Sequence, residues 1–237
     1  MAIAISELTS AYNNADATSY DTASISPAAG SFLVVFYATR HATTAPACTV
    51  SGLSLSWTET EPEQVDSITA IGCWTAQCGN SPGSGALTLT MDGAVTAIGC
   101  SWCVLQVTGH DWVNTVVQSP IAGTGLTGTT GTVTYSALGN AANAQITHFI
   151  HRANSTSTLD ASGSWVGSTD RAGGTPNHGS RVQWKLAAAD LTSTMTWSSA
   201  RWQGSGVEIK VAEDPRLRLD NRSSEPTRSV LTRAYNW

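Results

Sequence analysis

The chain has 237 residues, and no stretch of a dozen residues with amphipathic helical periodicity lies between its apolar segments. Instead, short apolar or alternating stretches are separated by turns rich in Gly, Pro, Asn and Ser. In "SYDTASISPAAGSFLVVFY", an alternating segment ends at Ile25 and is followed by the turn Pro27–Gly30 and by the apolar run Phe32–Tyr37. This pattern predicts a strand, a turn and a buried strand. The lack of amphipathic helices argues against a parallel α/β architecture.

Similar strands recur along the chain. We expect them at residues 1–10, 17–25, 32–37, 48–57, 67–76, 85–91, 95–109, 131–138, 144–153, 181–188, 192–199 and 206–212. Only 12% of the residues are charged, and only two are Lys, which favours strands and tight turns over solvated helices. The sequence therefore predicts an all-β protein with an antiparallel two-sheet β-sandwich.

The C-terminal segment differs sharply from the rest of the chain. Residues 213–237 hold 9 charged side chains, whereas residues 1–212 hold 20. We therefore predict two parts, a β-sandwich body over residues 1–212 and an extended, charged C-terminal arm over residues 213–237.

Charge and hydropathy exclude several functional classes. The net charge is −5, with −6 in residues 1–212 and +1 in residues 213–237, so no basic face is expected to bind nucleic acid. No apolar run reaches the eighteen or so residues of a membrane span. The start, "MAIAISELTS", lacks the basic region of a secretory signal. We expect a soluble protein that folds where it is made.

The five cysteines are an odd number, which is unusual for a disulfide framework, and we expect reduced, buried thiols. Cys73 and Cys78 are five residues apart, and Cys100 and Cys103 are three apart. On strands these separations place each pair on opposite faces, so neither pair is expected to bind zinc.

Two further motifs resemble binding sites. "GTGLTG", residues 123–128, matches a dinucleotide-binding pattern, but a Thr-rich strand rather than a helix follows it, so we expect a flexible loop. His148 and His151 in "HFIH" are three apart and should lie on opposite faces of a strand, which argues against a metal pair. We predict no cofactor and no metal.

Three glutamates, Glu59, Glu61 and Glu63, alternate in "TETEPEQVD" with Asp66 nearby. An extended segment would place the three on one side, where they could form a solvated acidic loop, a calcium site or the acid/base pair of a glycosidase. Pro62 interrupts the strand pattern, and the solvated loop is the preferred interpretation.

No sequence pattern points to catalysis, because there is no Gly-x-Ser-x-Gly motif and a catalytic triad is a spatial arrangement that sequence does not reveal. We predict a protein that is not an enzyme. Exposed tryptophans could form a platform for sugars, although most should pack in the core. The tryptophans are Trp57, Trp74, Trp102, Trp112, Trp165, Trp184, Trp197, Trp202 and Trp237.

The order of several segments resembles a known family. These segments are "SYDTASISPAAGSFLVVFYA", "TVSGLSLSWTET", "ALTLTMDGAVTAIGCSWCVLQVTGHD", "TVTYSALGNAANAQITHFIHRAN" and "WQGSGVEIKVA". Over residues 5–212 they are similar to the jelly-roll-like β-sandwich domain of tailed-phage virion proteins, of the capsid decoration (cement) or fibre type. The resemblance implies a jelly-roll-like fold and a structural role, and it brings no catalytic motif.

A decoration protein needs a body that sits on the capsid and an extension that contacts its neighbours. The arm fits this role, because arginines can bind carboxylates and apolar or aromatic side chains can anchor an interface. The residues expected to make these contacts are Arg216, Leu217, Arg218, Leu219, Arg222, Arg228, Leu231, Arg233, Tyr235 and Trp237.

The sequence and the resemblance together predict a phage virion structural protein. Its expected partners are the major capsid protein and copies of itself in a trimer, and its expected location is the capsid surface after folding in the host cytoplasm. The alternative is a tail-fibre or receptor-binding domain that recognises host glycans through an exposed Trp and the Thr-rich segment 122–132. A polysaccharide-cleaving enzyme with the glutamates of residues 59–63 is the third possibility.

Overall fold

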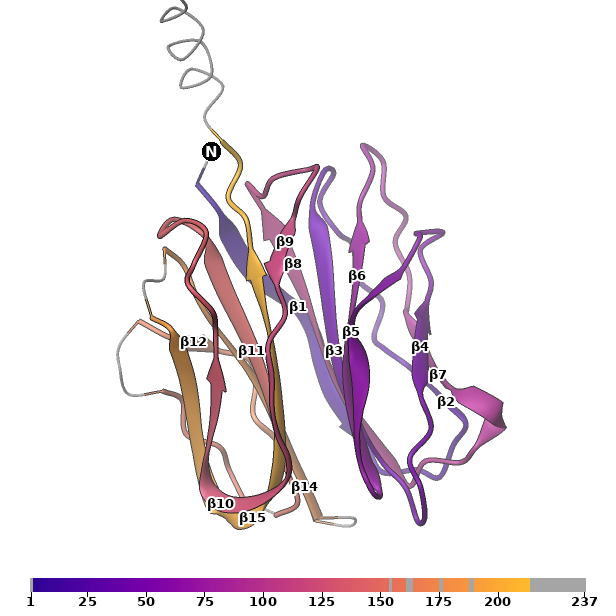
Figure 1. The fold of residues 1–237 in the computed structure, drawn as a ribbon. Helices are drawn as coiled ribbons and strands as arrows, with labels where there is room; N and C mark the ends of the chain where they lie inside the picture. The colour runs from indigo at the N-terminus through magenta and orange to yellow at the C-terminus, as the bar shows by residue number, and fades with distance from the viewer. Residues whose placement is uncertain (1, 154, 161–163, 175–176, 188–189, 214–237) are drawn as a thin grey trace, which may run out of the picture.

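The computed structural model describes residues 2–153, 155–160, 164–174, 177–187 and 190–213. In these residues the chain forms fifteen β-strands and one short 3-10 turn, Asp92–Ala94, and no α-helix. The strands pair antiparallel in three sheets that lie side by side as layers (Figure 1). The predicted all-β, antiparallel class is confirmed, but the sheets number three and not two.

The central sheet has five strands in the spatial order β1, β8, β3, β6 and β5. Their bounds are β1 (Ala4–Asn13), β8 (Gly99–Thr108), β3 (Phe32–Arg40), β6 (Thr69–Gln77) and β5 (Thr58–Asp66). The N-terminal segment thus forms a strand, as predicted, and this strand lies at the edge of the sheet. β3 lies in the middle of this sheet and pairs along its whole length with both β6 and β8.

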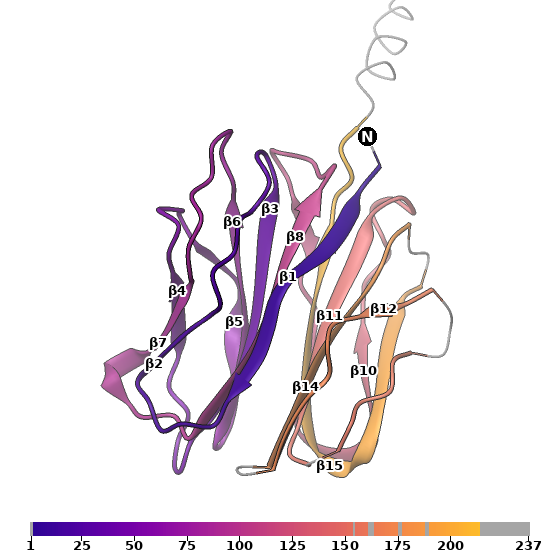
Figure 2. The ribbon, with the colours of Figure 1, turned by 180° about the vertical axis from the view of Figure 1, so that it is seen from behind.

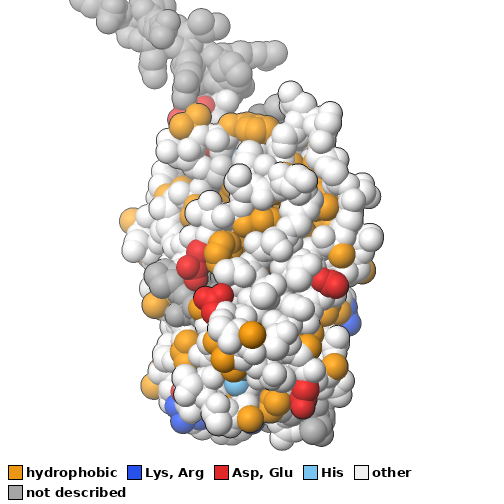
Figure 3. All heavy atoms as spheres, turned by 90° about the vertical axis from the view of Figure 1, so that its right-hand side faces the viewer, with side chains coloured by type: hydrophobic (Ala, Val, Ile, Leu, Met, Phe, Trp, Pro, Cys, Tyr) orange, Lys and Arg blue, Asp and Glu red, His pale blue; other side chains and the backbone are white. Residues whose placement is uncertain are grey.

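A small sheet covers one face of the central sheet. It contains β2 (Ser19–Asp21), β7 (Thr88–Met91) and β4 (Cys48–Ser51), with β7 in the middle. Its outer face is formed by alternate Ser, Thr and Asp residues of these strands, which are exposed or half-buried. The surface on this side of the molecule is accordingly dominated by uncharged polar groups, with few Lys or Arg side chains (Figure 3).

The third sheet covers the opposite face of the central sheet (Figure 2). It contains the path β10 (Ile121–Thr134), β15 (Thr192–Ile209), β11 (Ala144–His151), β14 (Asn177–Lys185) and β12 (Val166–Gly167). Two short strands add to it, β9 (Val116–Gln118) beside β15 and β13 (Arg171–Gly174) beside β14. The first half of β15 pairs with β10, whereas the second half also pairs with β11.

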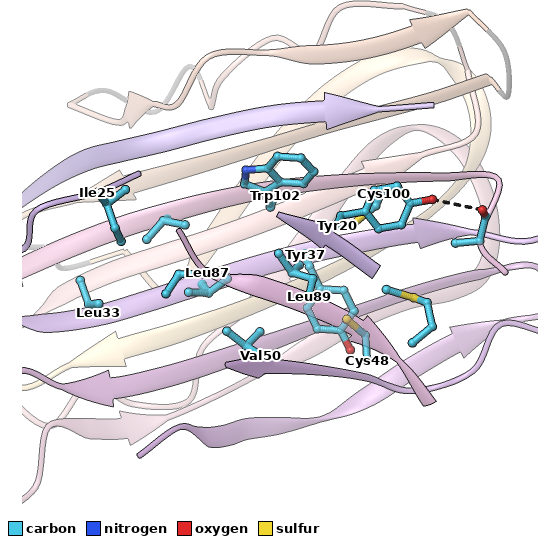
Figure 4. Packing of buried hydrophobic residues seen from close by; sticks show 14 of the residues in the cluster. Tyr20, Ile25, Leu33, Tyr37, Cys48, Val50, Leu87, Leu89, Cys100 and Trp102 are labelled. Carbon is cyan, nitrogen blue, oxygen red and sulfur yellow. Dashed lines mark hydrogen bonds between the residues drawn. The ribbon is translucent and has the colours of Figure 1, made fainter. Parts of the chain in front are cut away.

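Two separate cores explain why the apolar run of β3 requires three layers. Leu33, Val35 and Tyr37 point into the core shared with the small sheet, together with residues such as Leu89 and Trp102 (Figure 4). The alternate side chains, Phe32, Val34 and Phe36, belong to the core shared with the third sheet. Because successive strand residues point to opposite faces, a strand that is apolar on both faces must be covered on both. A two-sheet sandwich would leave one of these faces in water.

The cysteines follow the same alternation, as predicted. Cys78 and Cys100 lie in the core with the small sheet, and Cys73 and Cys103 lie in the core with the third sheet. All five cysteines are buried free thiols. His148 and His151 also lie on opposite faces of β11, with the ring of His148 against Phe36 and the ring of His151 stacked on Trp197.

Two predicted loops are strands. Residues 58–66, interpreted as a solvated acidic loop, form β5, in which Glu61 and Asp66 are buried by the third sheet. The "GTGLTG" segment lies within β10. There Gly123 and Gly125 have φ of +80° and +78°, and the register with β15 shifts between Ala122 and Leu126. These glycines therefore form a bulge in a strand, not a loop.

Other strand boundaries also differ from the sequence prediction. The two strands expected at 192–199 and 206–212 form the single strand β15, and β9, β12 and β13 were not predicted. In the segment 17–25 only β2 is a strand, although Ile25 also pairs with Gly85 through an isolated bridge. The predicted arm lies outside the described residues from residue 214 onward.

Candidate functional site

The acidic segment does not form a metal site in the described residues. Glu59 is exposed, whereas Glu61 is 2% exposed and paired with Cys73 in the ladder of β5 and β6. Register shifts on both sides of Glu61 break the alternation that would have placed the glutamates together. No group of three His, Cys, Asp or Glu residues in the described part of the chain is arranged to hold a metal ion.

Glu61 is an unusual buried acid. Among the described residues, neither of its carboxylate oxygens accepts a hydrogen bond. Burial raises the pKa of Glu61 to about 8, although the nearby amide of Gly206 opposes the shift. Glu208, also buried, accepts hydrogen bonds from Asn143 Nδ2 at 2.6 Å and Gln118 Nε2 at 2.5 Å. Glu208 thus has a structural role, whereas for Glu61 the cost of burying the charge outweighs the effect of the nearby Gly206 amide.

Asp66, at the end of β5, connects two sheets. Its carboxylate forms ion pairs with Arg152 at 3.2 Å and with Arg201 at 2.5 Å, and its side chain is 6% exposed. The two arginines come from the third sheet or the segment that follows β11, so the carboxylate joins that sheet to the edge of the central sheet. The Asp66 carboxylate is therefore occupied by the two arginines and does not face solvent.

Three buried histidines form hydrogen bonds with serines. His178 contacts Ser101 at 2.9 Å, His148 contacts Ser180 at 2.9 Å and His151 contacts Ser157 at 3.0 Å, each through Nε2. Burial lowers the pKa of His148 and His178 to about 3 and that of His151 to about 4. A Ser–His pair can be nucleophile and base, but all three histidine side chains are shielded from solvent. We interpret these pairs as parts of the packed layers.

The accessible site is a cleft at the end of the molecule where the described chain stops. It has a volume of about 500 Å³ and is lined by residues 110–114 on one side and by Lys210, Ala212 and Glu213 on the other. Gly109 brings the two ends of the body together, because a side chain there would overlap the backbone of Ala2 and its carbonyl accepts a hydrogen bond from the amide of Ala212. The two described ends therefore lie close together (Figure 1), and Glu213 at the C-terminal end lines the cleft.

The loop that lines the cleft is held in place by Asp111. Its Oδ1 accepts hydrogen bonds from the amides of Val113 at 2.9 Å and Asn114 at 3.0 Å, and its Oδ2 accepts one from Lys210 Nζ at 3.0 Å. These bonds lower the pKa of Asp111 to about 2. Since Asp111 is committed to the loop, we do not consider it a catalytic group.

The chain leaving β15 is anchored along the opposite wall. The amide of Lys210 donates to the carbonyl of Thr115 and the amide of Asp111 donates to the carbonyl of Lys210, each at 2.8 Å. The amide of Val211 donates to Asn143 Oδ1 at 3.1 Å. The segment that leads to residue 213 is therefore part of the rigid body, and its direction of exit is defined.

Two large apolar side chains of the loop face solvent. Trp112 is 53% exposed and Val113 is 86% exposed, whereas His110 beneath them is buried and packs between Phe32 and Trp112. Of the tryptophans in the described residues, Trp112 alone is more than half exposed, and the others are half-buried or buried. An exposed Trp next to an exposed Val is a typical feature of a binding surface.

The cleft was not predicted, and the predicted partner residues cannot be placed. Trp112 was one of nine tryptophans, and no local pattern in "GHDWV" indicates that its ring is exposed. The arm residues from Arg216 to Trp237 lie outside the described part of the chain. The Thr-rich segment 122–132, suggested as a glycan-binding loop, lies within β10.

The fold and the cleft define an all-β protein with several antiparallel sheets and a candidate binding surface at one end. Comparison with protein-family models, with curated proteins and with solved structures gives no match. Among the described residues, no helix has the length and apolar character needed to cross a membrane.

Proposed function

We propose that this chain is a structural protein of a tailed-phage virion, a capsid decoration protein whose arm binds neighbouring subunits. The proposal includes a jelly-roll-like fold, the major capsid protein as a partner, and a homo-oligomer, with a trimer as the preferred state. It rests on the resemblance in the order of sequence segments and on one structural observation, the anchored exit of the chain at Glu213 beside an exposed aromatic surface.

The exit geometry supports an arm that reaches outward. Residues 210–212 are fixed to the body by backbone hydrogen bonds, so the chain passes residue 213 from a rigid position. A further 24 residues follow, and fully extended they would span on the order of 80 Å. A compact body of this size has a radius of gyration of roughly 17 Å. The arm is thus long enough to cross an adjacent subunit, and such a tether makes several weak contacts act together.

The body offers little that favours catalysis. Among its described residues, the buried acids Asp66 and Glu208 are engaged in structural bonds, and the Ser–His pairs are enclosed by the sheets. Glu61 is buried in the core and does not line the cleft. Of the titratable groups that do line the cleft, His110 is buried, and Asp111 and Lys210 are engaged with each other.

The test of the proposed function is the solution mass of the full chain and of a version that ends at Ala212, measured by light scattering. We expect the full chain to be an oligomer, preferably a trimer, and the shortened chain to be a monomer. Far-UV circular dichroism and thermal unfolding of the shortened chain provide the control for folding. The same number of subunits in both versions would contradict arm-mediated assembly.

A glycan-binding fibre domain is the second candidate, and the exposure of Trp112 favours it. An aromatic face suits a sugar ring, and Asn114, Lys210 and Glu213 supply polar groups around the same cleft. A glycan array with the full chain and with Trp112→Ala tests this function. Specific binding that disappears in the variant would favour the fibre domain over the decoration protein.

A further inference from the structure

We propose that the cleft at Trp112 receives the apolar end of the C-terminal arm of a neighbouring copy of this chain. This inference rests on the proposed function, and it assigns the partner surface that the arm would use. The occupant is residues 230–237, "VLTRAYNW", and the receptor is the loop of residues 110–114 together with the wall formed by residues 210–213.

The receptor surface is already formed in the isolated chain. Asp111 fixes the loop through two backbone amides and Lys210, and Thr115 adds a hydrogen bond from its Oγ1 to the carbonyl of Asp111 at 2.7 Å. Trp112 packs close to Gly30 on one side and is exposed on the other. A fixed loop loses little conformational entropy when a ligand binds, which favours affinity.

The chemistry of the arm complements that surface. Residues 230–237 contain Val230, Leu231, Tyr235 and Trp237 together with Arg233. The apolar and aromatic side chains can cover Trp112 and Val113, and aromatic pairs add to the stability of such contacts. Arg233 can join the ion pair that Glu213, 48% exposed at the rim, forms with Lys210 at 3.4 Å.

The length of the arm allows it to reach a neighbouring copy. Glu213 itself lines the cleft, so the arm begins at its rim, and Tyr235 lies 22 residues further along. A return to the cleft of the same chain is the competing arrangement, and the crosslinking experiment below distinguishes the two. An arm that spans on the order of 80 Å can reach the equivalent cleft of an adjacent body. When each copy gives one arm and receives one, the contacts close into a symmetric ring.

Photo-crosslinking in the full chain tests this inference. A photoreactive amino acid replaces Val113 in one sample and Val166 in a control sample, since Val166 is also exposed but lies in β12. We expect position 113 to form adducts with residues 230–237 in a species of twice the chain mass, and position 166 to form none with that segment. Mixing ¹⁴N- and ¹⁵N-labelled chains before irradiation should give adducts that join one label to the other.

A second measurement uses single-residue variants of the full chain. Trp112→Ala and Trp237→Ala should each weaken self-association at least tenfold, as measured by sedimentation, and Val166→Ala should not. Adducts confined to one chain, adducts to another surface, or no adducts at all would overturn the inference. If the full chain still assembles through its arm while these variants associate normally, the cleft assignment is wrong and the proposed function stands. If removal of the arm leaves the number of subunits unchanged, the proposed function fails as well.

Discussion

Arg201 on β15 binds Asp66 at the end of β5 with two hydrogen bonds, from Nε to Oδ2 at 3.0 Å and from Nη2 to Oδ1 at 2.5 Å. Arg152 approaches the same carboxylate from the segment after β11 and also donates to the Asp66 carbonyl. One side chain therefore joins the edge of the central sheet to two points of the third sheet. The remainder of this seam is polar as well, with Gln64 donating to the carbonyl of Gly204 and Thr69 donating to Gln203.

The variant Asp66→Asn should destabilise the protein by about 2–3 kcal/mol, because it leaves the partly buried Arg152 without its counter-charge. The exposure of Arg201 keeps the effect below that of a fully buried pair. Urea unfolding measures the change. Asp21→Asn is the matched control, since Asp21 is exposed and accepts one hydrogen bond from Thr88, and it should change stability by less than about 0.5 kcal/mol. Equal losses in the two variants would contradict the role of the seam.

Glu61 should make the protein less stable at alkaline pH. Its folded-state pKa, about 8, lies above the ordinary value, so the unfolded chain releases this proton first as the pH rises. The free energy of unfolding should therefore fall between about pH 4.5 and pH 8 through this group, by up to about 1.4 kcal/mol per pH unit.

Glu61→Gln removes this titration, and it should gain at least about 2 kcal/mol relative to the natural chain between pH 5 and pH 9. Chemical unfolding at both pH values measures the gain. Glu59→Gln, on the same strand but at an exposed position, is the control for the loss of one carboxylate. A parallel response of both variants would show that Glu61 is ionised in the folded protein.

The buried histidines should destabilise the protein in acid. The pKa values of His148, His151 and His178 lie at about 3 to 4, below that of an unfolded histidine, so the unfolded chain binds protons first as the pH falls from 6.5. Each should remove up to about 1.4 kcal/mol per pH unit between pH 6.5 and its folded pKa. Urea unfolding at pH 7, 6 and 5 gives the slope, and His148→Gln should reduce it by one proton. An unchanged slope would mean that His148 is charged in the core.

The two glycines of the β10 bulge should differ in their tolerance of a side chain. Both have positive φ, which costs an alanine roughly 1–2 kcal/mol. A Cβ at Gly123 would in addition overlap the ring of Trp202, whereas a Cβ at Gly125 would meet Arg201 Nη2 at 3.2 Å. We expect Gly123→Ala to destabilise the protein by about 2–4 kcal/mol. The loss in Gly125→Ala should be smaller than this by at least about 1 kcal/mol. Thermal unfolding of the two variants under one buffer condition makes the comparison.

The five thiols should be unreactive in the folded protein. All are buried, and burial raises the pKa of the Cys73, Cys78, Cys100 and Cys103 thiols, so little thiolate is available. A thiol reagent such as DTNB should label none of them in the native chain and all five after denaturation. Fast labelling of one thiol in native buffer would identify a local opening of the layers.

Strand positions were the most predictable part of the fold, because their signal is local. The alternation that ends at Ile25, the turn before Phe32 and the apolar run of β3 are properties of adjacent residues. The separation of Cys100 from Cys103 and of His148 from His151 likewise placed each pair on opposite faces, since the side-chain period of a strand is two. A run of six apolar residues in β3 even carried the information that both faces are buried, although the sequence prediction provided only two sheets.

The polar segments were less predictable. β5 reads as an exposed acidic stretch, and it is a strand because Asp66 and Gln64 find partners on β15 and its neighbours, more than 80 residues away in the chain. Because the register shifts on both sides of Glu61, strict alternation does not hold there, and Glu61 is buried while Glu59 is exposed. The glycines at 123 and 125 led to the prediction of a loop. Their positive φ forms a bulge within a strand because β15 supplies the partner.

The sequence by itself determined the all-β class, most strand positions, the burial of the thiols and the change of composition near residue 213. Tertiary structure alone decided that there are three layers, that Glu61 is buried between two of them, and that Trp112 faces solvent beside the end of the described chain. The physical reason is range. Strand periodicity and turn chemistry act between neighbours in the chain, whereas burial of a face depends on which distant strand packs against it.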